Sequence, residues 1–448
     1  MYINTRFGII FVRSKLYSFF LNIIMFFGLV SLVISNPPIV IIPALYGSNL
    51  YATYGKGYSK HWYCPKHMDH KMFWVDWKYL IPPEINCFFE LLRGYYDPVT
   101  DSVTSEPGLT IDIPDFGGVD SITNIDKGVF GHPFVEALGS LIELFKKHGY
   151  VVKKDLFGAP YDWRLAMVGI ESTFYPKLKD LIELAFQKNN EKVTILGYSC
   201  GGMAIQRFLT KFVTTEWKEK YIKKVIFLAP AFAGSGATLN VAWNKIFPIL
   251  HFLKLKSIAD TAEASPCVQS LFPNHVVFQN YKIVDGPNGE TLYPKDLSQF
   301  LIDHGKVSGN NILLLKKSEK IVSDEPVDIG VPFYLIYNSG ISTEFGLKFK
   351  KSYKEEPERT FLPGDDVVPA AGPEYACNKW KAEKGMVCHN LNQKDTKFDH
   401  VGLGTNPFVR DLILNVTLNN YAIPNSKKFI QEQHRIDTDG QHYHIKDY

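Results

Sequence analysis

One serine in the sequence stands in a pattern that is typical of nucleophilic catalysis. Residues 192–203 read KVTILGYSCGGM and place Ser199 between Gly197 and Gly201. In a sharp strand-to-helix turn, small residues on both sides let neighbouring backbone pass close by, and the serine hydroxyl stands clear at the helix N-terminus. Such a G-x-S-x-G pattern can also arise by chance in a chain with 33 glycines. Because an apolar run precedes it and a helix-like pattern follows it, we predict a nucleophile elbow.

Two later segments offer the partners that a serine nucleophile needs. A serine hydroxyl becomes reactive when a base removes its proton and a third group orients that base. In hydrolases with this elbow, the acid and then the histidine follow along the chain. Asp365 and Asp366 lie in the turn-like stretch LPGDDVVP, and His400 lies in a glycine-flanked loop before a helix opened by Pro407. This order predicts a triad of Ser199, Asp365 and His400.

Attack by Ser199 on an ester would create an oxyanion, which two backbone amides are expected to stabilise. One amide is that of Cys200, the residue after the serine. The other comes from the loop after the first strand, PALYGSNL, where Leu45 is the best candidate. Cys200 is also a rival nucleophile, but its position in the elbow favours a role as an amide donor with a small side chain.

Short apolar runs of the kind that form buried parallel strands recur along the chain. Amphipathic stretches at 133–149, 174–189 and 202–212 are predicted to be helices between them. Alternation of strands and helices predicts a doubly wound α/β sheet. The apolar runs are IVII (39–42), YVV (150–152), VTIL (193–196), VIFL (225–228) and FYLIY (333–337).

Two stretches, 60–120 and 231–330, break this alternation. We predict that both are insertions on one sheet, because loops of such length without structure of their own are unusual. The first is rich in aromatic residues, with ten among residues 62–96, about twice what the chain average of 14% would give. The rings of Trp74 and Trp77 could sit at a lipid headgroup boundary. A small aromatic subcore under a disulfide is the alternative.

The N-terminus is typical of a chain that enters the secretory pathway. Basic residues precede an apolar block at 16–34, and the turn-forming residues 35–38 follow it. The block would span about 28 Å as a helix, so a cleaved signal peptide and a membrane anchor are both open. Cleavage is favoured, because the first strand begins so soon that an anchor would press the folded domain against the bilayer.

Secretion would place the six cysteines in an oxidising compartment. Cys64 and Cys87 can then close a loop worth roughly 3 kcal/mol in the chain-entropy treatment. Cys377 and Cys388 can close a shorter loop, and six unpaired thiols are the alternative. A zinc site in HWYCPKHMDH would compete with a Cys64 disulfide, and we expect no metal. Asn415 begins the sequon NVT, in a helix-like stretch that would hinder glycosylation.

Composition limits the classes of partner. The net charge of +3 is small for 448 residues and the lysines form no stripe, which argues against nucleic acid. An aromatic content of 14% fits a lipid ligand as well as a large core.

Four motifs together resemble the lecithin:cholesterol acyltransferase family, which includes a lysosomal phospholipase A that also acts as a transacylase. They are IIPALYGSNL (41–50), APYDWRL (159–165), GYSCGG (197–202) and PGDDVVP (363–369). The resemblance covers residues from about 38 to 418. It implies an α/β-hydrolase fold with an inserted lid or membrane-binding subdomain and a cap. It also implies acyl transfer from a phospholipid through a serine acyl-enzyme to water or a lipid alcohol.

Carried over by position, the resemblance makes Ser199 the nucleophile, Asp365 the acid and His400 the base, with Leu45 and Cys200 as oxyanion amides. The spacing of Cys64 and Cys87 around the two tryptophans matches the disulfide-bounded lid of the family. Four departures stand out. Ala44 replaces a usual glycine, Tyr198 replaces a common histidine, the match around His400 is loose, and the second cysteine pair is closer together than in the plasma enzyme.

We therefore expect a monomeric enzyme without a cofactor, which acts at a phospholipid membrane or lipoprotein surface in the lysosome or outside the cell. A neutral-lipid or carboxyl esterase with the same triad is one alternative. A catalytically inactive lipid-binding protein is another, although it would lack a triad residue. The acceptor, the position of cleavage and the pH optimum stay open.

The expected parts are a signal peptide or anchor (1–35), core (36–59), lid (60–120), core with elbow (121–230), cap (231–330), core with acid and base (331–420) and a solvated tail (421–448).

Overall fold

The computed structural model describes residues 36–59, 61–123, 125–126, 138–247, 254–424, 426–432 and 445–447. The predicted signal segment (1–35) and the start of the predicted helix at 133–149 lie outside these residues. Pro37–Tyr448 forms one compact unit. None of the helices in the described ranges combines the length and hydrophobicity needed to cross a bilayer.

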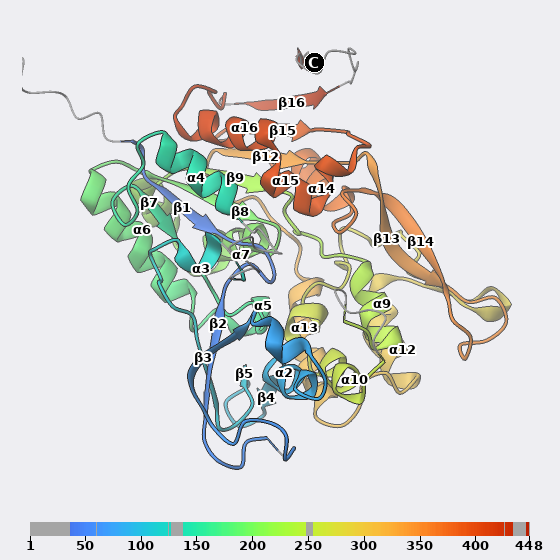
Figure 1. Cartoon of the computed structure of the whole chain (residues 1–448). Helices are drawn as coiled ribbons and strands as arrows, with labels where there is room; N and C mark the ends of the chain where they lie inside the picture. The colour runs from blue at the N-terminus through green and yellow to red at the C-terminus, as the bar shows by residue number, and fades with distance from the viewer. Residues whose placement is uncertain are drawn as a thin grey trace, which may run out of the picture. The chain divides into compact units, whose positions relative to one another are not determined.

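An eight-stranded sheet forms the centre of this unit (Figure 1). All neighbouring strands run parallel except the last pair, β16 and β17, which is antiparallel. Parallel neighbours require crossover connections, which helices supply here. In spatial order the strands are β17 (Ile445–Asp447), β16 (Lys427–Glu432), β15 (Met386–Asn390), β12 (Phe333–Tyr337), β9 (Ile222–Leu228), β8 (Val193–Tyr198), β1 (Ile39–Ile42) and β7 (Leu156–Gly158).

Helices cover both faces of the sheet, which explains the continuous apolar runs in its strands. In β1, Val40 and Ile42 belong to the core cluster that includes residues of α6 and α7, whereas Ile39 and Ile41 belong to the cluster with α4 and α16. Figure 1 shows α4 and α16 on one side and α6 on the other. This arrangement is the α/β-hydrolase fold. The helices are α3 (Asp120–Thr123), α4 (Gly139–Lys147), α5 (Ala166–Gly169), α6 (Tyr175–Asn189), α7 (Cys200–Arg207), α8 (Thr215–Tyr221), α14 (Ala371–Lys379), α15 (His400–Thr405) and α16 (Pro407–Thr417).

Most predicted core elements lie where expected, and three predicted segments differ. The predicted strand at 150–152 does not form: Val151 is exposed and leads into a turn, Val152 makes only an isolated bridge to Leu156, and the edge strand is β7, a few residues later. Asp155 Oδ1 accepts a hydrogen bond from the Val151 amide at 2.6 Å, which holds this segment in a turn. The tail is not entirely solvated, because β16 pairs with β15 and buries Ile430 in the core. The predicted helix at 202–212 is α7 followed by a turn of π-helix at Phe208–Phe212.

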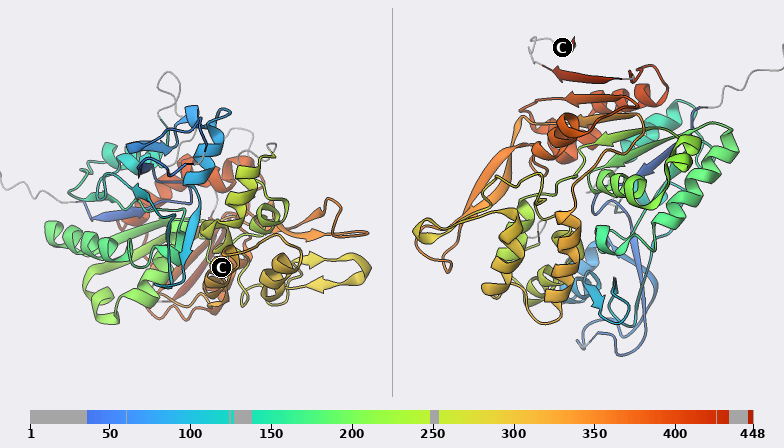
Figure 2. Two further views of the ribbon diagram at one scale, coloured as in Figure 1. Left: turned by 90° about the horizontal axis from the view of Figure 1, so that it is seen from below. Right: turned by 180° about the vertical axis from the view of Figure 1, so that it is seen from behind.

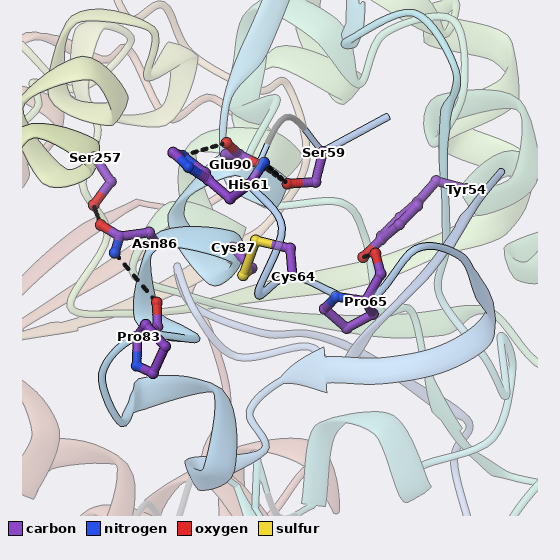
Figure 3. Close-up of a disulfide and its surroundings, with 10 residues drawn as sticks. All are labelled: Tyr54, Ser59, His61, Cys64, Pro65, Pro83, Asn86, Cys87, Glu90 and Ser257. Carbon is purple, nitrogen blue, oxygen red and sulfur yellow. Dashed lines mark hydrogen bonds and ion pairs between the residues drawn. A yellow bond between two sulfur atoms is a disulfide. The ribbon is translucent and has the colours of Figure 1, made fainter. Parts of the chain in front are cut away.

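The segment predicted to be a lid contains a disulfide between Cys64 and Cys87 (Figure 3). The bond joins the loop before β3 to α2, so Cys64 is not available as a zinc-binding thiolate. Ser257 in α10 (Lys256–Glu263) donates to Asn86 Oδ1 in α2 at 2.7 Å, which links this segment to the predicted cap. Its elements are β2 (Leu50–Tyr54), β3 (Met68–Trp74), η1 (Trp77–Leu80), α2 (Ile85–Leu91), β4 (Gly94–Asp97), β5 (Ser102–Ser105) and β6 (Leu109–Asp112).

The predicted cap consists of short helices and a strand pair. β10 pairs with β11 on one side and with β13, from later in the chain, on the other, and β13 pairs with β14; Figure 2 shows the yellow and orange strands side by side. A second disulfide, Cys377–Cys388, joins α14 to β15. The elements are α9 (Ala237–Asn244), α10 (Lys256–Glu263), α11 (Pro266–Gln269), β10 (Val284–Asp285), η4 (Pro287–Gly289), β11 (Thr291–Leu292), η5 (Pro294–Asp296), α12 (Leu297–Asp303), α13 (Asn311–Ser323), β13 (Ile341–Lys348) and β14 (Glu358–Gly364).

The APYDWR motif joins the sheet to the lid. Arg164 is fully buried and pairs with Asp162 through two short contacts of 2.6 and 2.9 Å. The same guanidinium donates to Leu91 O at 2.6 Å and to Ser105 Oγ at 2.7 Å, both in the lid. A buried arginine is stable only when its donors are satisfied, so these contacts explain why the motif needs this side chain.

Candidate active site

Ser199 lies between β8 and α7 with a strained backbone, at φ 55° and ψ −118°. This conformation turns the chain sharply and leaves the hydroxyl at the helix N-terminus. Gly201 is required by the close approach of β1, because a Cβ atom there would lie 2.4 Å from Ile42 O. A Cβ atom at Gly197 would meet the backbone of Gly201 at 2.9 Å. The local geometry is that of the predicted elbow.

The structure brings Ser199, His400 and Asp365 together in one hydrogen-bonded chain. His400 Nε2 lies 2.8 Å from Ser199 Oγ, and His400 Nδ1 lies 2.8 Å from Asp365 Oδ2. With Nδ1–H donated to the carboxylate, Nε2 is free to accept the serine proton. The three residues are only 4%, 7% and 2% exposed, so little water competes for these contacts.

Asp365 is held in the turn that follows β14. Its other oxygen, Oδ1, accepts hydrogen bonds from the amides of Val367 at 3.1 Å and Val368 at 2.7 Å. The neighbouring Asp366 has a left-handed backbone, with φ 82°, and its side chain is exposed. Partial burial, and then the charges of Asp399 and Asp365, raise the pKa of Asp366. Asp365, rather than Asp366, is therefore the carboxylate oriented toward the histidine.

His400 is the first residue of α15, whereas the sequence predicted a loop. Asp399 caps this helix, since its Oδ1 accepts from the Gly402 amide at 2.7 Å. Two helices in quick succession explain the difference, because α15 ends at Thr405 and α16 begins at Pro407 as expected. The His400 amide also donates to Asp365 O at 2.6 Å, so backbone and side chain both join acid and base.

Leu45 and Cys200, the predicted oxyanion residues, line the same cavity as Ser199. Cys200 begins α7, where the helix dipole favours negative charge. Burial, reinforced by the nearby Cys267, raises the pKa of the Cys200 thiol to about 12. The thiol is therefore protonated at neutral pH, which argues against Cys200 as a nucleophile.

An apolar cavity of about 420 Å³ opens onto Ser199, within the size range of small-molecule sites. Its walls come from the loop after β1, the lid, the cap and the segments that carry Asp366 and His400. Sequence reasoning missed the wall residues Tyr46 and Phe247, whose only sequence signal was apolar character. The lid contributes Trp74, Val75, Trp77 and Leu80, and the cap contributes Val241, Phe247, Val268 and Leu271.

The two predicted lid tryptophans line this cavity instead of forming an exposed surface. Trp74 is only 4% exposed, packs its ring 4.7 Å from that of Trp163, and donates Nε1–H to Tyr46 O at 2.8 Å. Trp77 is half-buried and donates to Asp126 Oδ2 at 2.8 Å. The aromatic subcore therefore describes Trp74 better than a headgroup contact does. Trp62, at 91% exposure, is the ring that the lid presents to solvent.

The sequon at Asn415 lies within α16, where it is poorly suited to modification. Asn415 Nδ2 donates to Asp411 O at 2.9 Å, and the hydroxyl of the buried Thr417 donates to Ile413 O at 2.7 Å. Both side chains are engaged with their own helix.

The fold defines the chain as an α/β-hydrolase, and comparison with known proteins gives its family. The model of the lecithin:cholesterol acyltransferase family matches residues 70–324, more than half of the chain. The chain belongs to this family. It is 26% identical over 395 residues to phosphatidylcholine-sterol acyltransferase of Mus musculus, with 87% of each chain covered. It is 26% identical over 356 residues to lysosomal phospholipase A and acyltransferase of Bos taurus, covering 78% of this chain and 84% of the relative.

Among solved structures, a monoacylglycerol lipase of Paleococcus ferrophilus is similar at 14% identity and a TM-score of 0.28. The similarity covers 63% of this chain and 89% of that one.

Proposed function

We propose that this protein is a serine-dependent phospholipase A and O-acyltransferase, with Ser199, His400 and Asp365 as its catalytic residues. The observation that carries the proposal is the Asp365–His400–Ser199 hydrogen-bond chain at the wall of an apolar cavity. The names of the family relatives, which are acyltransferases and a phospholipase, support the same chemistry.

In the first half-reaction, His400 Nε2 accepts the proton of Ser199 Oγ as that oxygen attacks the acyl carbonyl carbon of a phospholipid. The carbonyl oxygen becomes an oxyanion, which the amides of Leu45 and Cys200 stabilise. The intermediate then collapses: the bond to the lysophospholipid oxygen breaks, and His400 returns its proton to that leaving group. Ser199 is left as an ester of the fatty acid.

In the second half-reaction, water or a lipid alcohol attacks the Ser199 ester, with His400 again as the base. The products are a free fatty acid or an acylated alcohol. The apolar lining of the cavity fits an acyl chain, since burial of each CH₂ group contributes about 0.8 kcal/mol. Such a cavity favours a long-chain donor over a short one.

Lipid mass spectrometry tests the proposal. Phosphatidylcholine liposomes that contain cholesterol and a short-chain ceramide would be incubated with the wild-type protein and with Ser199→Ala, at acid and at neutral pH. We expect lysophosphatidylcholine and an acyl product from the wild type and neither from the variant. Acylated ceramide at acid pH would indicate lysosomal action, and sterol ester at neutral pH would indicate extracellular action. Turnover by a folded Ser199→Ala variant would contradict the proposal.

The choice of substrate distinguishes the proposed phospholipase and acyltransferase from a neutral-lipid or carboxyl esterase with the same three residues. On mixed liposomes that contain phosphatidylcholine and triacylglycerol, we expect lysophospholipid to form first. Release of fatty acid from triacylglycerol alone would identify the esterase instead. The disulfides support a protein of the secretory pathway, because such bonds persist in oxidising compartments.

A further inference from the structure

Tyr198 contacts the proposed base although it belongs to the strand that carries the nucleophile. Its hydroxyl donates a hydrogen bond to the backbone oxygen of His400. Its ring stacks on the imidazole, with the ring centres 5.6 Å apart and the planes inclined by 27°. The residue directly before Ser199 therefore contacts both the ring and the backbone of His400.

The Tyr198 side chain packs among buried apolar side chains, which cannot accept a hydrogen bond from its hydroxyl. The side chain is buried in the same core cluster as Leu403 of α15. Burial raises the pKa of Tyr198 far above its ordinary value, so the hydroxyl stays protonated and acts as a donor. A buried donor without an acceptor is costly, which favours retention of the contact with His400.

Gly404 lets α15 approach this ring. A Cβ atom at position 404 would lie 3.2 Å from Tyr198 Cε1 and 3.3 Å from its hydroxyl oxygen. Further hydrogen bonds of this segment join the His400 amide to Asp365 O and the Gly402 amide to Asp399 Oδ1. The Tyr198 hydrogen bond and the contact of His400 Nε2 with Ser199 Oγ both join α15 to the end of β8, but only the Tyr198 bond of these two holds the backbone of the histidine.

We propose that Tyr198 is a positioning residue that holds His400 at hydrogen-bond distance from Ser199. The inference rests on the proposed function of the triad. Because Tyr198 and Ser199 are consecutive, a movement of the elbow also moves the Tyr198 hydroxyl, which holds the backbone of His400. Proton transfer depends on such alignment, and a displacement of about 1 Å can cost about 10²-fold in rate. Histidine is common at this position in the family, so the contact is assigned to this chain from its own geometry.

A fluorophosphonate probe measures the reactivity of Ser199 without the lipid surface. Labelling forms a bond from Ser199 Oγ to phosphorus as the bond to fluoride breaks, and the serine proton passes to His400. We expect Tyr198→Phe, which removes only the hydroxyl, to lower the labelling rate constant by about tenfold. On a soluble ester, kcat should fall by a similar factor with KM unchanged, because phenylalanine keeps the ring that Tyr198 contributes to the cavity wall.

Tyr150→Phe is the matched control, since the Tyr150 hydroxyl is buried without a hydrogen-bond partner in the described part of the chain. We expect it to label at the wild-type rate. Equal labelling by folded Tyr198→Phe and Tyr150→Phe variants would overturn the inference, as would a Tyr198→Phe effect confined to KM. Neither result touches the proposed function, which the Ser199→Ala variant and the choice of lipid substrate test separately.

Gly404→Ala supplies a second variant if Tyr198→Phe does not fold. Alanine suits a helix better than glycine does, so α15 itself should form. The added methyl group would crowd both the ring and the hydroxyl of Tyr198, so the hydroxyl must shift from its position against His400 O. We expect slower labelling here also, and labelling at the wild-type rate by folded Gly404→Ala would contradict the inference.

Discussion

The sheet and the two insertions contribute to the site in different ways. The end of β8 and the segments after β14 and before α16 hold Ser199, Asp365 and His400 through short, directional hydrogen bonds. The lid and the cap instead supply apolar walls, held by ring packing, a disulfide and the Arg164 contacts. Directional bonds tolerate little change in length or angle, whereas apolar walls tolerate changes of shape that conserve volume.

We therefore expect the hydrogen-bonded residues to determine the chemistry and the apolar walls to determine which substrates are accepted. In the proposed mechanism, changes in the hydrogen-bonded chain should affect every ester substrate alike, because they would act on the reacting atoms. Changes in the walls should alter stability and the choice of substrate. The following variants test that separation, from the largest expected effect to the smallest.

Asp365→Asn should lower kcat by about 10³–10⁴-fold on both liposomes and a soluble ester. The amide would leave the histidine in the wrong tautomer while its shape keeps the fold. Asp366→Asn is the matched control, and we expect a change of less than about tenfold because this carboxylate is exposed. Steady-state kinetics measure kcat for both variants. A larger loss of kcat in Asp366→Asn than in Asp365→Asn would make Asp366 the acid instead of Asp365.

Trp74→Ala should remove a buried ring from the lid and lower the free energy of unfolding by about 3–5 kcal/mol. Because Trp74 lines the cavity and is not exposed, liposome and soluble-ester activities should fall together. Urea unfolding followed by fluorescence gives the first value, and paired assays give the second. A loss confined to liposomes would restore Trp74 as a membrane contact.

The double variant Cys64→Ser, Cys87→Ser should lose about 3 kcal/mol of stability in the chain-entropy treatment. We expect the loss to be local, so that limited proteolysis cuts first in the lid. The matched control, Cys377→Ser with Cys388→Ser, opens a bond in the core and should leave the lid cleavage sites protected. Identical cleavage maps for both variants would show that the lid does not depend on its own disulfide.

Gly201→Ala should lower the free energy of unfolding by about 1–3 kcal/mol, because its Cβ atom would press on the backbone of β1. Gly55→Ala is the control, since a Cβ atom there would meet nothing within 4 Å. Equilibrium unfolding in urea compares them. A Gly201→Ala protein as stable as the control would mean that the elbow is less tightly packed than its geometry indicates.

Trp62→Ala should have the smallest effect, a loss of a few-fold in liposome activity with soluble-ester activity unchanged. This ring is fully solvated, so its removal costs little stability. Liposome sedimentation and the two assays measure the outcome. Unchanged liposome activity would indicate that another surface contacts the membrane.

The sequence predicted the centre of the fold well for a physical reason. β1 and β12 begin and end where their apolar runs do, because strands buried on both faces need unbroken apolar sequence. The order of Ser199, Asp365 and His400 was predictable because the elbow, a turn-forming aspartate pair and a glycine-flanked histidine each have local signatures.

What the sequence did not predict depends on contacts between distant segments. Burial of Trp74 follows from its packing on Trp163, some 90 residues later in the chain. The pairing of β16 with β15 and the hydrogen bond from Arg164 to Leu91 O also join distant segments, so no short sequence pattern predicts them. Tyr198 appeared only as a departure from the family, since its hydrogen bond to His400 spans about 200 residues of the sequence.

Trapping of the acyl-enzyme tests the central claim most directly. The protein would be mixed with phosphatidylcholine that carries deuterated acyl chains, quenched in acid within the first turnovers and digested for peptide mass spectrometry. We predict a deuterated acyl group on the peptide that contains Ser199, and its absence in Ser199→Ala. Turnover with no acyl group on Ser199, or with the group on Cys200, would contradict the account.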